Sequence, residues 1–483
     1  MAVGITSYGA YVPLHRMARE IFYKSWGGAK MPGERSICSF DEDSVTMAME
    51  SAIDCLTGTD PKTIDGLFFA TTTATYKERL CASILATALD MRRDIRTMDI
   101  TDTLRAGTSA VATAADTVRA GSAKSILVVS GEHRMAAPAG DFEMALGDGA
   151  AALLIGDDKV IATIEGSYHI SDEFSGIWRS DQDEFIRAWE DRMIYDKGYS
   201  QILVEAIKGL MKKYDASAGD FAKIVYNTTL ETRRHGLIAK SLKFEPEQVQ
   251  DPLFTTVGNT GSAQALMILV SALEEAKPGD KILWANYENG GDAFILKVTD
   301  EIKNLGERRG IKRHLESKKM LENNDRYLRW RKLVPLERAR RSEQSPVSLA
   351  ALHRDAMVAL ALYGVKCTNC GTPQFSQGGS YGYFTPLRVC VECQAVDQME
   401  PYKFSDKRGK VFTYTEDSLA DSNDPPTTVT VVDYEGGGRG IFDMTDRGGK
   451  DISVGMEVEM TFRKLFTDRG MHNYFWKTRP IRC

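Results

Sequence analysis

Four cysteines in the C-terminal part of the chain have the spacing of a metal site. Cys367 and Cys370 form one Cys-x-x-Cys pair, Cys390 and Cys393 form a second, and nineteen residues separate the pairs. Two tight turns that each present two thiolates give a tetrahedral sulfur site, which suits Zn²⁺. Four protein ligands leave no open position, so the zinc is expected to be structural. The alternative is a redox pair of disulfides, but the other four cysteines show no paired spacing.

A second position of chemical interest lies between an alternating apolar segment and a run of small residues, 106–120, that predicts a tightly packed helix. A side chain at such a strand-to-helix junction faces the partial positive charge of unpaired N–H groups, which lowers the pKa of a thiol there. The junction in this sequence spans residues 99–108 and contains Leu104 but no cysteine. A leucine can neither ionise nor form a thioester.

Six short motifs follow one another in an order that resembles the 3-hydroxy-3-methylglutaryl-CoA synthases of the thiolase superfamily. The resemblance covers residues 2 to about 332, and its first motif is similar to the first strand of the archaeal-type synthases. It implies a five-layer αβαβα domain made of two pseudo-repeated halves, a duplication that is not visible in the sequence itself. The motifs are residues 3–13, 41–44, 147–151, 258–262, 290–294 and 327–331.

The resemblance also implies where the catalytic residues of such a synthase would stand. These enzymes use a Cys nucleophile, a His that orients the acyl oxygen, a Glu as general acid and base, and an Asn. The matching positions hold Leu104, Thr228, Thr72 and Asn259, so only the Asn is retained. The three replacements are uncharged near pH 7, which excludes ordinary acyl-enzyme chemistry at these positions. Cys81 lies elsewhere and is expected to be a buried small apolar residue.

An aldol route remains open, because it needs an enolate and a proton shuttle but no thiolate. A superfamily site offers a tunnel for the pantetheine arm of CoA and backbone N–H donors that stabilise an enolate. Steroid side-chain aldolases, which are thiolase-fold proteins without an acyl-Cys, are similar to this picture. The candidate catalytic residues are Asn259, Tyr76, Asp102, Glu231 and Tyr287, with His235 as a further acid–base candidate; the candidate CoA-binding residues are Arg233, Gly258, Gly290 and Gly291.

Each of these candidates also has a purely structural interpretation. Tyr76 and Tyr287 are then packed or solvent-exposed side chains, and residues 233–235 are a charged helix face.

Three candidate functions follow from these interpretations. The first is an enzyme that makes or breaks a C–C bond next to a CoA thioester without a covalent acyl-enzyme. The second is a cysteine-dependent acyltransferase of synthase or thiolase type, and the third is a non-catalytic subunit that scaffolds a partner thiolase.

Length and composition favour a globular protein of more than one domain. The chain has 483 residues, 43% hydrophobic residues and a formal charge of −6, which favours neither nucleic acid nor a membrane surface as a partner. It contains no apolar run of membrane-spanning length and no apparent signal peptide. We therefore expect a cytoplasmic protein.

Residues 1–300 alternate between strand and helix signals, which predicts α/β layers. Strands are expected at 125–130, 281–285 and 293–298, and helices at 45–56 and 262–276.

The resemblance also implies a homodimer or a higher oligomer, because the small residues over 106–121 would permit close approach of two chains across a two-fold axis.

The remaining sequence predicts three further segments. Residues 301–346 form a basic helical tail and linker, either a solvated connector or a surface for CoA phosphates or a partner subunit. Residues 347–400 are expected to hold a helix and a zinc ribbon, and 401–483 a small β-barrel. This order resembles the family of OB-fold proteins with a rubredoxin-like zinc ribbon, which accompany thiolases as separate subunits. An OB-fold can bind nucleic acid, but the aromatic and basic platform for that task is sparse here.

Overall fold

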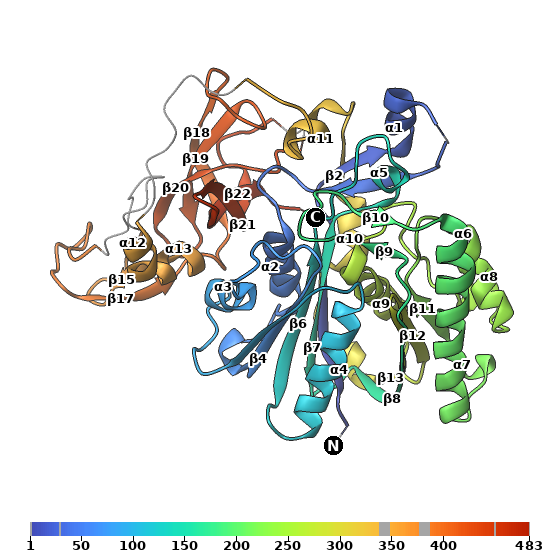
Figure 1. Ribbon diagram of the computed structural model, residues 1–483. Helices are drawn as coiled ribbons and strands as arrows, with labels where there is room; N and C mark the ends of the chain where they lie inside the picture. Colours follow the sequence, from blue (N-terminus) through green and yellow to red (C-terminus); the bar gives the residue numbers. More distant parts are fainter. Residues whose placement is uncertain (1, 29, 338–347, 376–386, 449–450, 483) are drawn as a thin grey trace. The chain divides into compact units, whose positions relative to one another are not determined.

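The computed structural model describes residues 2–28, 30–337, 348–375, 387–448 and 451–482 (Figure 1). These residues form two compact units. The first comprises Met1–Cys38, Asp43–Ser83 and Met91–Asn324, and the second comprises Ser39–Glu42, Ile84–Asp90 and Asp325–Cys483. Each unit is described separately below.

A nine-stranded mixed sheet forms the framework of the first unit, with the strand order β11-β12-β13-β8-β1-β7-β6-β4-β5. Its two halves meet where β1 pairs antiparallel with β8. The first half contains β1 (Gly4–Tyr11), β4 (Gly66–Ala70), β5 (Arg96–Ile100), β6 (Ser125–Glu132) and β7 (Gly149–Gly156). The second half contains β8 (Ala162–Ser171), β11 (Lys223–Tyr226), β12 (Lys281–Tyr287) and β13 (Gly290–Val298).

The two halves repeat one topology. In the first half the strands lie in the order third, second, fourth, fifth, first, counted along the chain. The second half has the same order, and a parallel bridge between Ile224 and Val249 stands in place of its third strand. In both halves the second and fourth strands are parallel, whereas the fifth is antiparallel to both of its neighbours. The duplication implied by the family resemblance is therefore present in the backbone.

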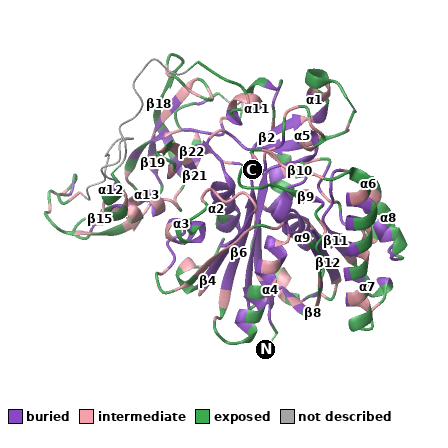
Figure 2. Ribbon diagram, viewed as in Figure 1, coloured by how far each residue is buried: buried purple, intermediate pink, exposed green. Residues whose placement is uncertain are grey.

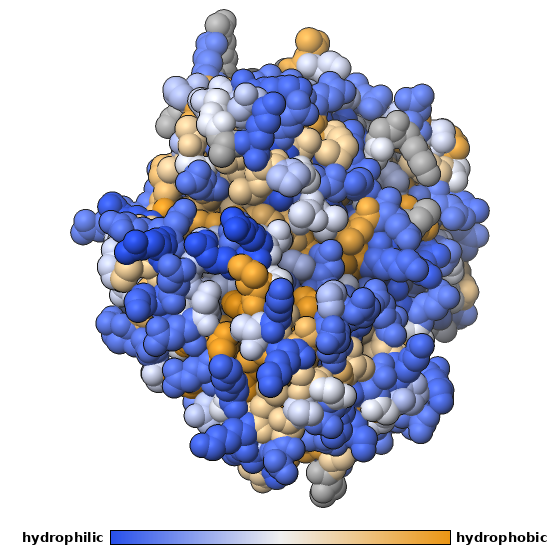
Figure 3. Space-filling model, turned by 90° about the vertical axis from the view of Figure 1, so that its right-hand side faces the viewer, coloured by the Kyte–Doolittle hydropathy of each residue, from blue (hydrophilic) through white to orange (hydrophobic). Residues whose placement is uncertain are grey.

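Helices complete the five expected layers. The central layer consists of α4 (Ala106–Arg119) and α9 (Gln264–Glu275), which contact each other between the two halves of the sheet. One outer layer is formed by α2 (Ser44–Cys55) on β1, β6 and β7, and the other by α7 (Val204–Lys213) on β8 and β13. The strands and the two central helices are largely buried (Figure 2). On the outer face that α7 covers, hydrophilic side chains predominate around smaller apolar patches (Figure 3).

The strands and helices named from the sequence are all formed, as β6, β12, β13, α2 and α9. Their ends follow local chemistry. Asp43 begins α2 with a capping box, in which its carboxylate accepts hydrogen bonds from the N–H groups of Val45 and Thr46. Ala276 ends α9 just before the Pro278-Gly279 turn.

The remaining elements of the first unit are short. A π-helix, η2 (Ile194–Leu203), continues directly into α7. Among the described residues no helix is both long and apolar enough to cross a membrane. The other strands and helices are β2 (His15–Ala18), α1 (Arg19–Trp26), β3 (Glu34–Ile37), α5 (Asp141–Ala145), β9 (Ile177–Trp178), β10 (Arg187–Ala188), α6 (Asp191–Met193), α8 (Arg233–Ser241), α10 (Gly310–Glu316) and β14 (Lys319–Met320). A further helix, α3 (Cys81–Ala88), has its first three residues in this unit and the others in the second unit.

The long segment of the second unit, Asp325–Cys483, begins with α11 (Asp325–Trp330) and two short helices, α12 (Leu349–Arg354) and α13 (Ala356–Ala361). A single helix was expected here; it is interrupted because Asp355 has φ −102° and ψ 19°, outside helical geometry. Residues 338–347, the end of the expected linker, lie outside the described residues. A three-stranded sheet follows, made of β15 (Tyr363–Cys367), β16 (Pro373–Gln374) and β17 (Met399–Lys403).

Five antiparallel-paired strands then form the small barrel expected from the sequence. They are β18 (Gly409–Asp417), β19 (Thr427–Tyr434), β20 (Arg439–Asp443), β21 (Glu457–Asp468) and β22 (Met471–Pro480), in the sheet order β20-β19-β18-β21-β22. A parallel bridge from Met444 to Thr478 joins the two edges. The cyclic order is first, second, third, fifth, fourth, a Greek-key barrel as expected for an OB-fold. Burial alternates strictly along β19, because every second side chain faces the barrel interior.

Two glycines in helices test how tightly the central layer is packed. A Cβ on Gly107 of α4 would lie 2.5 Å from the Ser262 carbonyl oxygen and 2.8 Å from Leu266 Cδ1, whereas one on Gly236 of α8 would meet nothing within 4 Å. Gly107→Ala should therefore destabilise the first unit by about 1–3 kcal/mol through overpacking. Gly236→Ala should stabilise it by about 0.5–1 kcal/mol, because alanine loses less backbone entropy in a helix. Urea unfolding measures both changes, and equal effects of the two substitutions would contradict this packing.

Candidate active site and metal centre

The four positions that match the catalytic residues of the synthases all lie at one edge of the sheet in the first unit. Thr72 follows β4, and Thr228 follows β11, the equivalent strand of the other half. Leu104 immediately precedes the N-terminal turn of α4, and Asn259 precedes α9 and bridges to Leu146. Ligands of α/β proteins bind at the carboxyl ends of strands, so this edge is the candidate site.

The backbone at Leu104 is held in place from the second half of the sheet. Asn286, in β12, donates from Nδ2 to the Leu104 carbonyl oxygen at 3.1 Å. The next residue, Arg105, is the N-cap of α4 but makes no side-chain cap. Its guanidinium instead donates to both oxygens of Asp292, at 3.0 and 2.6 Å. The N-terminus of α4 thus has no side-chain cap from Arg105 and lies behind a side chain that cannot act as a nucleophile. The N–H of its first residue, Ala106, donates to the Thr103 carbonyl oxygen at 3.0 Å.

Asp292 anchors this end of α4 to β13. Its buried carboxylate also accepts a hydrogen bond from Thr108 Oγ1 at 2.6 Å and pairs with His169 Nδ1 at 2.8 Å. Burial alone would raise the pKa of Asp292, but the hydrogen bonds from His169 and Arg105 outweigh it and lower the pKa below its ordinary value. Asp292 is therefore a fixed anion that positions the helix rather than a proton carrier.

A carboxylate reaches the Thr72 position from the neighbouring strand. β4 and β6 are parallel, and their register places Thr72 opposite Glu132, the last residue of β6. Thr72 donates to Glu132 from its backbone N at 2.7 Å and from Oγ1 at 3.0 Å, and Thr73 Oγ1 donates at 3.0 Å. Ser262 donates from Oγ at 2.6 Å and from its backbone N at 3.4 Å. Glu132 thus joins β4, β6 and the entrance of α9 through five hydrogen bonds.

Asn259, the one catalytic residue of the family that is retained, forms hydrogen bonds to the backbone with its side-chain amide. Its Nδ2 donates to the carbonyl oxygens of Thr228 at 2.8 Å and Thr229 at 3.1 Å. Its Oδ1 accepts from the backbone N of Gly261 at 2.9 Å and from Arg134 Nη1 at 3.5 Å. Asn259 therefore fixes the segment that follows β11, and both of its amide hydrogens are engaged.

Arg134 and Glu288 complete the polar cluster. Both are nearly fully buried, and the charge of Arg134 acts on the carboxyl groups of both Glu132 and Glu288. Among the described residues, none donates a hydrogen bond to the Glu288 carboxyl, and its Oε1 has no partner. Burial raises the pKa of Glu288 to about 8, although Arg134 partly offsets the increase. Glu288 is thus a protonated acid at neutral pH that can ionise just above it.

Each acid–base candidate named from the sequence has its own surroundings, and of these Tyr287 lies within electrostatic reach of Glu288. Tyr76 Oη accepts a hydrogen bond from Arg79 at 2.9 Å, and Asp102 is exposed with a positive φ of 72°. Glu231 caps α8, where it accepts hydrogen bonds from the backbone N–H groups of Arg233 and Arg234. Tyr287 is buried, with its Oη against Gly198 and without a partner among the described residues, and burial raises its pKa above the usual range.

The remaining candidates have structural surroundings. His235 is buried and stacked on Tyr226 with ring centroids 4.0 Å apart, and burial lowers its pKa to about 4. Gly258 has φ +97° and Gly290 has φ +118°, while Gly291 packs against the Ala206 side chain. Arg233 is exposed at the start of α8, so among the CoA-binding candidates it alone offers a free charge to solvent.

No described cysteine of the first unit has the surroundings of a nucleophile. Cys38, Cys55 and Cys81 are all buried. Burial raises the pKa of Cys55 to about 12 and also raises that of Cys81. Cys81 begins α3, but the carboxylate of Asp99 accepts hydrogen bonds from its backbone N and from that of Ala82. The helix N-terminus that could have favoured a thiolate is therefore already occupied by an anion.

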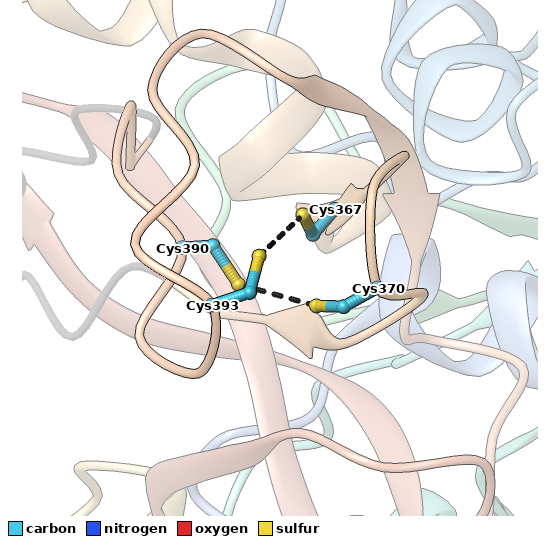
Figure 4. Close-up of side chains that lie close together, drawn as sticks. All are labelled: Cys367, Cys370, Cys390 and Cys393. Carbon is cyan, nitrogen blue, oxygen red and sulfur yellow. Dashed lines mark hydrogen bonds between the residues drawn. The ribbon is translucent and has the colours of Figure 1, made fainter.

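The second unit brings the four predicted metal ligands together (Figure 4). Their sulfur atoms all lie within 4.8 Å of one another, with 3.7 Å from Cys367 to Cys393 and 3.5 Å from Cys370 to Cys390. Tetrahedral zinc with Zn–S bonds of about 2.3 Å requires sulfur separations of about 3.8 Å, whereas a disulfide requires about 2.05 Å. The spacing fits a zinc ion and not two disulfides.

The two Cys-x-x-Cys turns have the same backbone design. Gly371 and Gln394, which follow the second cysteine of each pair, have positive φ angles of 78° and 60°. Each donates its N–H to the carbonyl oxygen of the first cysteine in its turn, at 2.8 and 3.1 Å. Asn369 Nδ2 also donates to Cys393 Sγ at 3.4 Å, which favours the thiolate that a metal ligand needs.

Sequence reasoning missed the residues at the centre of the cluster, namely Glu132, Arg134 and Glu288. A signal for them was present. Residues 132–134 place three polar side chains directly after an apolar strand, and Glu288 directly follows another. Charged residues at the carboxyl ends of buried strands are the positions from which an α/β protein builds its site.

Comparison with known proteins identifies a family model and relatives that this chain resembles in sequence. Residues 98–172 match the family model of 3-oxoacyl-[acyl-carrier-protein] synthase III. The hydroxymethylglutaryl-CoA synthase of Methanopyrus kandleri is 33% identical over 318 residues, which cover 63% of this chain and 90% of that protein. The corresponding enzyme of Thermococcus gammatolerans is 30% identical over 331 residues, which cover 66% of this chain and 93% of that protein.

Solved structures agree with the fold. A crystal structure of an HMG-CoA synthase complexed with CoA superposes with a TM-score of 0.59 at 18% identity, covering 71% of this chain and 93% of that one. The 3-oxoacyl-[acyl-carrier-protein] synthase III of Aquifex aeolicus superposes with a TM-score of 0.55 at 19% identity, covering 61% of this chain and 99% of that one. Both matches support the thiolase-like architecture of the first unit.

The protonated state of Glu288 makes a prediction about stability. The folded protein holds a proton on Glu288 up to a pH of about 8, whereas the unfolded chain releases it near pH 4.5. Stability from this group is therefore complete below pH 4.5 and is lost as pH rises to about 8, with a slope of at most about 1.4 kcal/mol per pH unit. Glu288→Gln should remove this dependence, so the variant should gain stability relative to wild type between pH 5 and 8. A difference in urea-unfolding free energy that stays constant over this range would contradict the assignment.

Proposed function

Because the chain belongs to the hydroxymethylglutaryl-CoA synthase family of the thiolase superfamily, we propose that it is an enzyme that makes or breaks a C–C bond next to a CoA thioester. The observation that carries the proposal is the buried polar cluster of Glu132, Arg134 and Glu288 at the family's catalytic edge. Buried ionisable groups at such an edge are typical of catalytic sites. The acyl-CoA substrate is inferred from the family, in which one solved synthase holds CoA.

The proposed route is of the aldol type and has no covalent acyl-cysteine. Leu104 stands at the nucleophile position, and the described cysteines of the first unit are buried. An enolate formed next to the thioester would place its oxygen near the first turn of α4, where N–H groups and the helix dipole stabilise negative charge. Asn259 was a candidate catalytic residue; since its amide hydrogens bind the carbonyl oxygens of Thr228 and Thr229, we propose that it positions this segment instead.

CoA itself is proposed to reach the site along the segments named from the sequence. Gly258, Gly290 and Gly291 pack against neighbouring parts of the chain itself, whereas Arg233 offers a positive charge at the start of α8. An exposed guanidinium can pair with a phosphate of CoA.

Covalent labelling tests the absence of an acyl-enzyme. After incubation with radiolabelled acetyl-CoA and denaturation, we expect no stable label on any cysteine, because a leucine at a helix N-terminus cannot attack a thioester. Cys81→Ala should leave activity within a few-fold of wild type, since its thiol is buried and its pKa is raised.

A label on Cys81, or on any other cysteine, would instead support the alternative of a cysteine-dependent acyltransferase. The non-catalytic alternative, a subunit that scaffolds a partner thiolase, has one observation in its favour: Leu104, Thr72 and Thr228 replace three family residues. Inactivity of the purified chain, with activity restored only by an added thiolase, would support it.

We propose one structural Zn²⁺ per chain, bound by Cys367, Cys370, Cys390 and Cys393. When bound, the ion cross-links the two turns, and it has no open position for catalysis. Serine at either Cys370 or Cys393 should release the metal and unfold the ribbon, because so small a module buries little apolar surface. Cys38→Ser, at a buried cysteine outside the ribbon, is the control and should keep full metal content.

Metal analysis after expression in zinc-replete medium measures this directly. The expected result is about one equivalent of zinc per chain, and less than about half an equivalent would contradict the site.

Three further expectations concern the protein's surroundings. The family resemblance implies a homodimer or a higher oligomer, which a monomeric mass in light scattering would contradict. In the structure the small residues of α4 are largely used within the chain, for example at Gly107, which lies against Ser262. A partner thiolase and a cytoplasmic location also stay predictions.

A further inference from the structure

Two glutamates lie at the carboxyl ends of equivalent strands in the two halves of the sheet. Glu132 ends β6, and Glu288 directly follows β12; these are the fourth strands of their halves. Both are buried, with residue exposures of 0% and 4%. The duplicated topology therefore brings two carboxyl groups to one edge, on either side of the pseudo-two-fold axis.

The two glutamates differ in their hydrogen bonds. Glu132 accepts five, from Thr72, Thr73 and Ser262, so its oxygens are saturated by the protein. Glu288 accepts none from the described residues, and its Oε1 lies buried without a partner. A buried polar group without a partner costs free energy, so such a group in a native site calls for an occupant.

Arg134 lies within electrostatic reach of both carboxyl groups. It is 5% exposed, and its charge interacts with Glu132 and Glu288. Among the described residues, however, it makes no ion pair within 4.0 Å, and its one hydrogen bond goes to Asn259 at 3.5 Å. A guanidinium carries five donors, so Arg134 retains donors for a ligand beside Glu288.

We propose that Glu288 is the catalytic acid–base of this enzyme and that Arg134 faces the same bound acyl group. This inference rests on the proposed function, because it assigns the proton shuttle that a C–C bond-forming step without an acyl-cysteine requires. The other candidates are engaged elsewhere: Tyr76 with Arg79, and Glu231 with the N-terminus of α8. Tyr287 is directed at Gly198 of the π-helix.

The proton balance of the step is simple. In its ionised form Glu288 removes a proton from the carbon next to the thioester carbonyl. The C–H electron pair moves into the enolate, and the proton forms an O–H bond on Glu288. Return of the same proton to carbon, or to the alkoxide formed when the enolate attacks a carbonyl, restores the carboxylate. Burial raises the pKa of Glu288 to about 8. A catalytic acid–base is most effective when its pKa lies near the pH at which the enzyme works.

Deuterium exchange tests the assignment without knowledge of the second substrate. Wild-type protein in D₂O should exchange the methyl protons of acetyl-CoA, measured by mass spectrometry, and the rate should rise with pH through about 8. Glu288→Gln should lower the exchange rate by about a hundredfold or more. Glu288→Asp should restore part of the rate and shift its pH profile, and CoA affinity by calorimetry should change by less than a few-fold in either variant.

Glu274→Gln is the matched control. Glu274 is a half-buried glutamate of the first unit whose pKa burial raises to about 7, but it accepts hydrogen bonds from the backbone of Ile311 and Lys312. This variant should exchange at the wild-type rate. Wild-type exchange that survives Glu288→Gln would overturn the role of Glu288 and leave the proposed function intact. Absence of exchange in the wild-type protein, with both acetyl-CoA and propionyl-CoA, would contradict the proposed function itself.

Discussion

The hydrogen bonds of Glu132 are the constraint on which the candidate site depends. They join three segments that are distant in sequence, namely residues 72–73 after β4, the end of β6 and Ser262 before α9. A buried carboxylate requires such donors, because burial without them is costly. Thr72 therefore contacts a carboxylate that the neighbouring strand supplies.

Much of the fold follows from local patterns. The alternation of strand and helix signals predicted β6, β12, β13, α2 and α9, and the cysteine spacing predicted two similar turns with their sulfur atoms together. The duplication was implied by the family resemblance and is not visible in the sequence itself, although the two halves share strand order and direction. The same strand topology can be packed by very different sets of apolar side chains, because a core tolerates substitution when its volume and pattern are kept. The interruption at Asp355 was also missed, since a single helical period spans it.

The site was predictable only where a residue type marks its own role. The four thiols of the ribbon do so, and the leucine at position 104 excludes a nucleophile by its chemistry alone. Glu231 and Tyr287 are both chemically suitable as proton carriers. In the fold, however, Glu231 accepts a hydrogen bond from the α8 backbone and Tyr287 packs against Gly198, and the residue types alone do not reveal this. Glu288 was missed for the opposite reason. Its importance lies in the absence of hydrogen-bond partners among the described residues, and only the folded surroundings disclose that.

We propose that the reaction centre lies beside Glu288 and not beside a cysteine. A crystal structure of the protein with a non-hydrolysable thioether analogue of acetyl-CoA tests it most directly. We expect the acyl methyl carbon within about 3–3.5 Å of a Glu288 carboxyl oxygen, a distance at which a proton can transfer. We also expect the acyl oxygen to face the first turn of α4. An acyl group bound against Cys81, or one that leaves Glu288 out of reach, would contradict the role of Glu288.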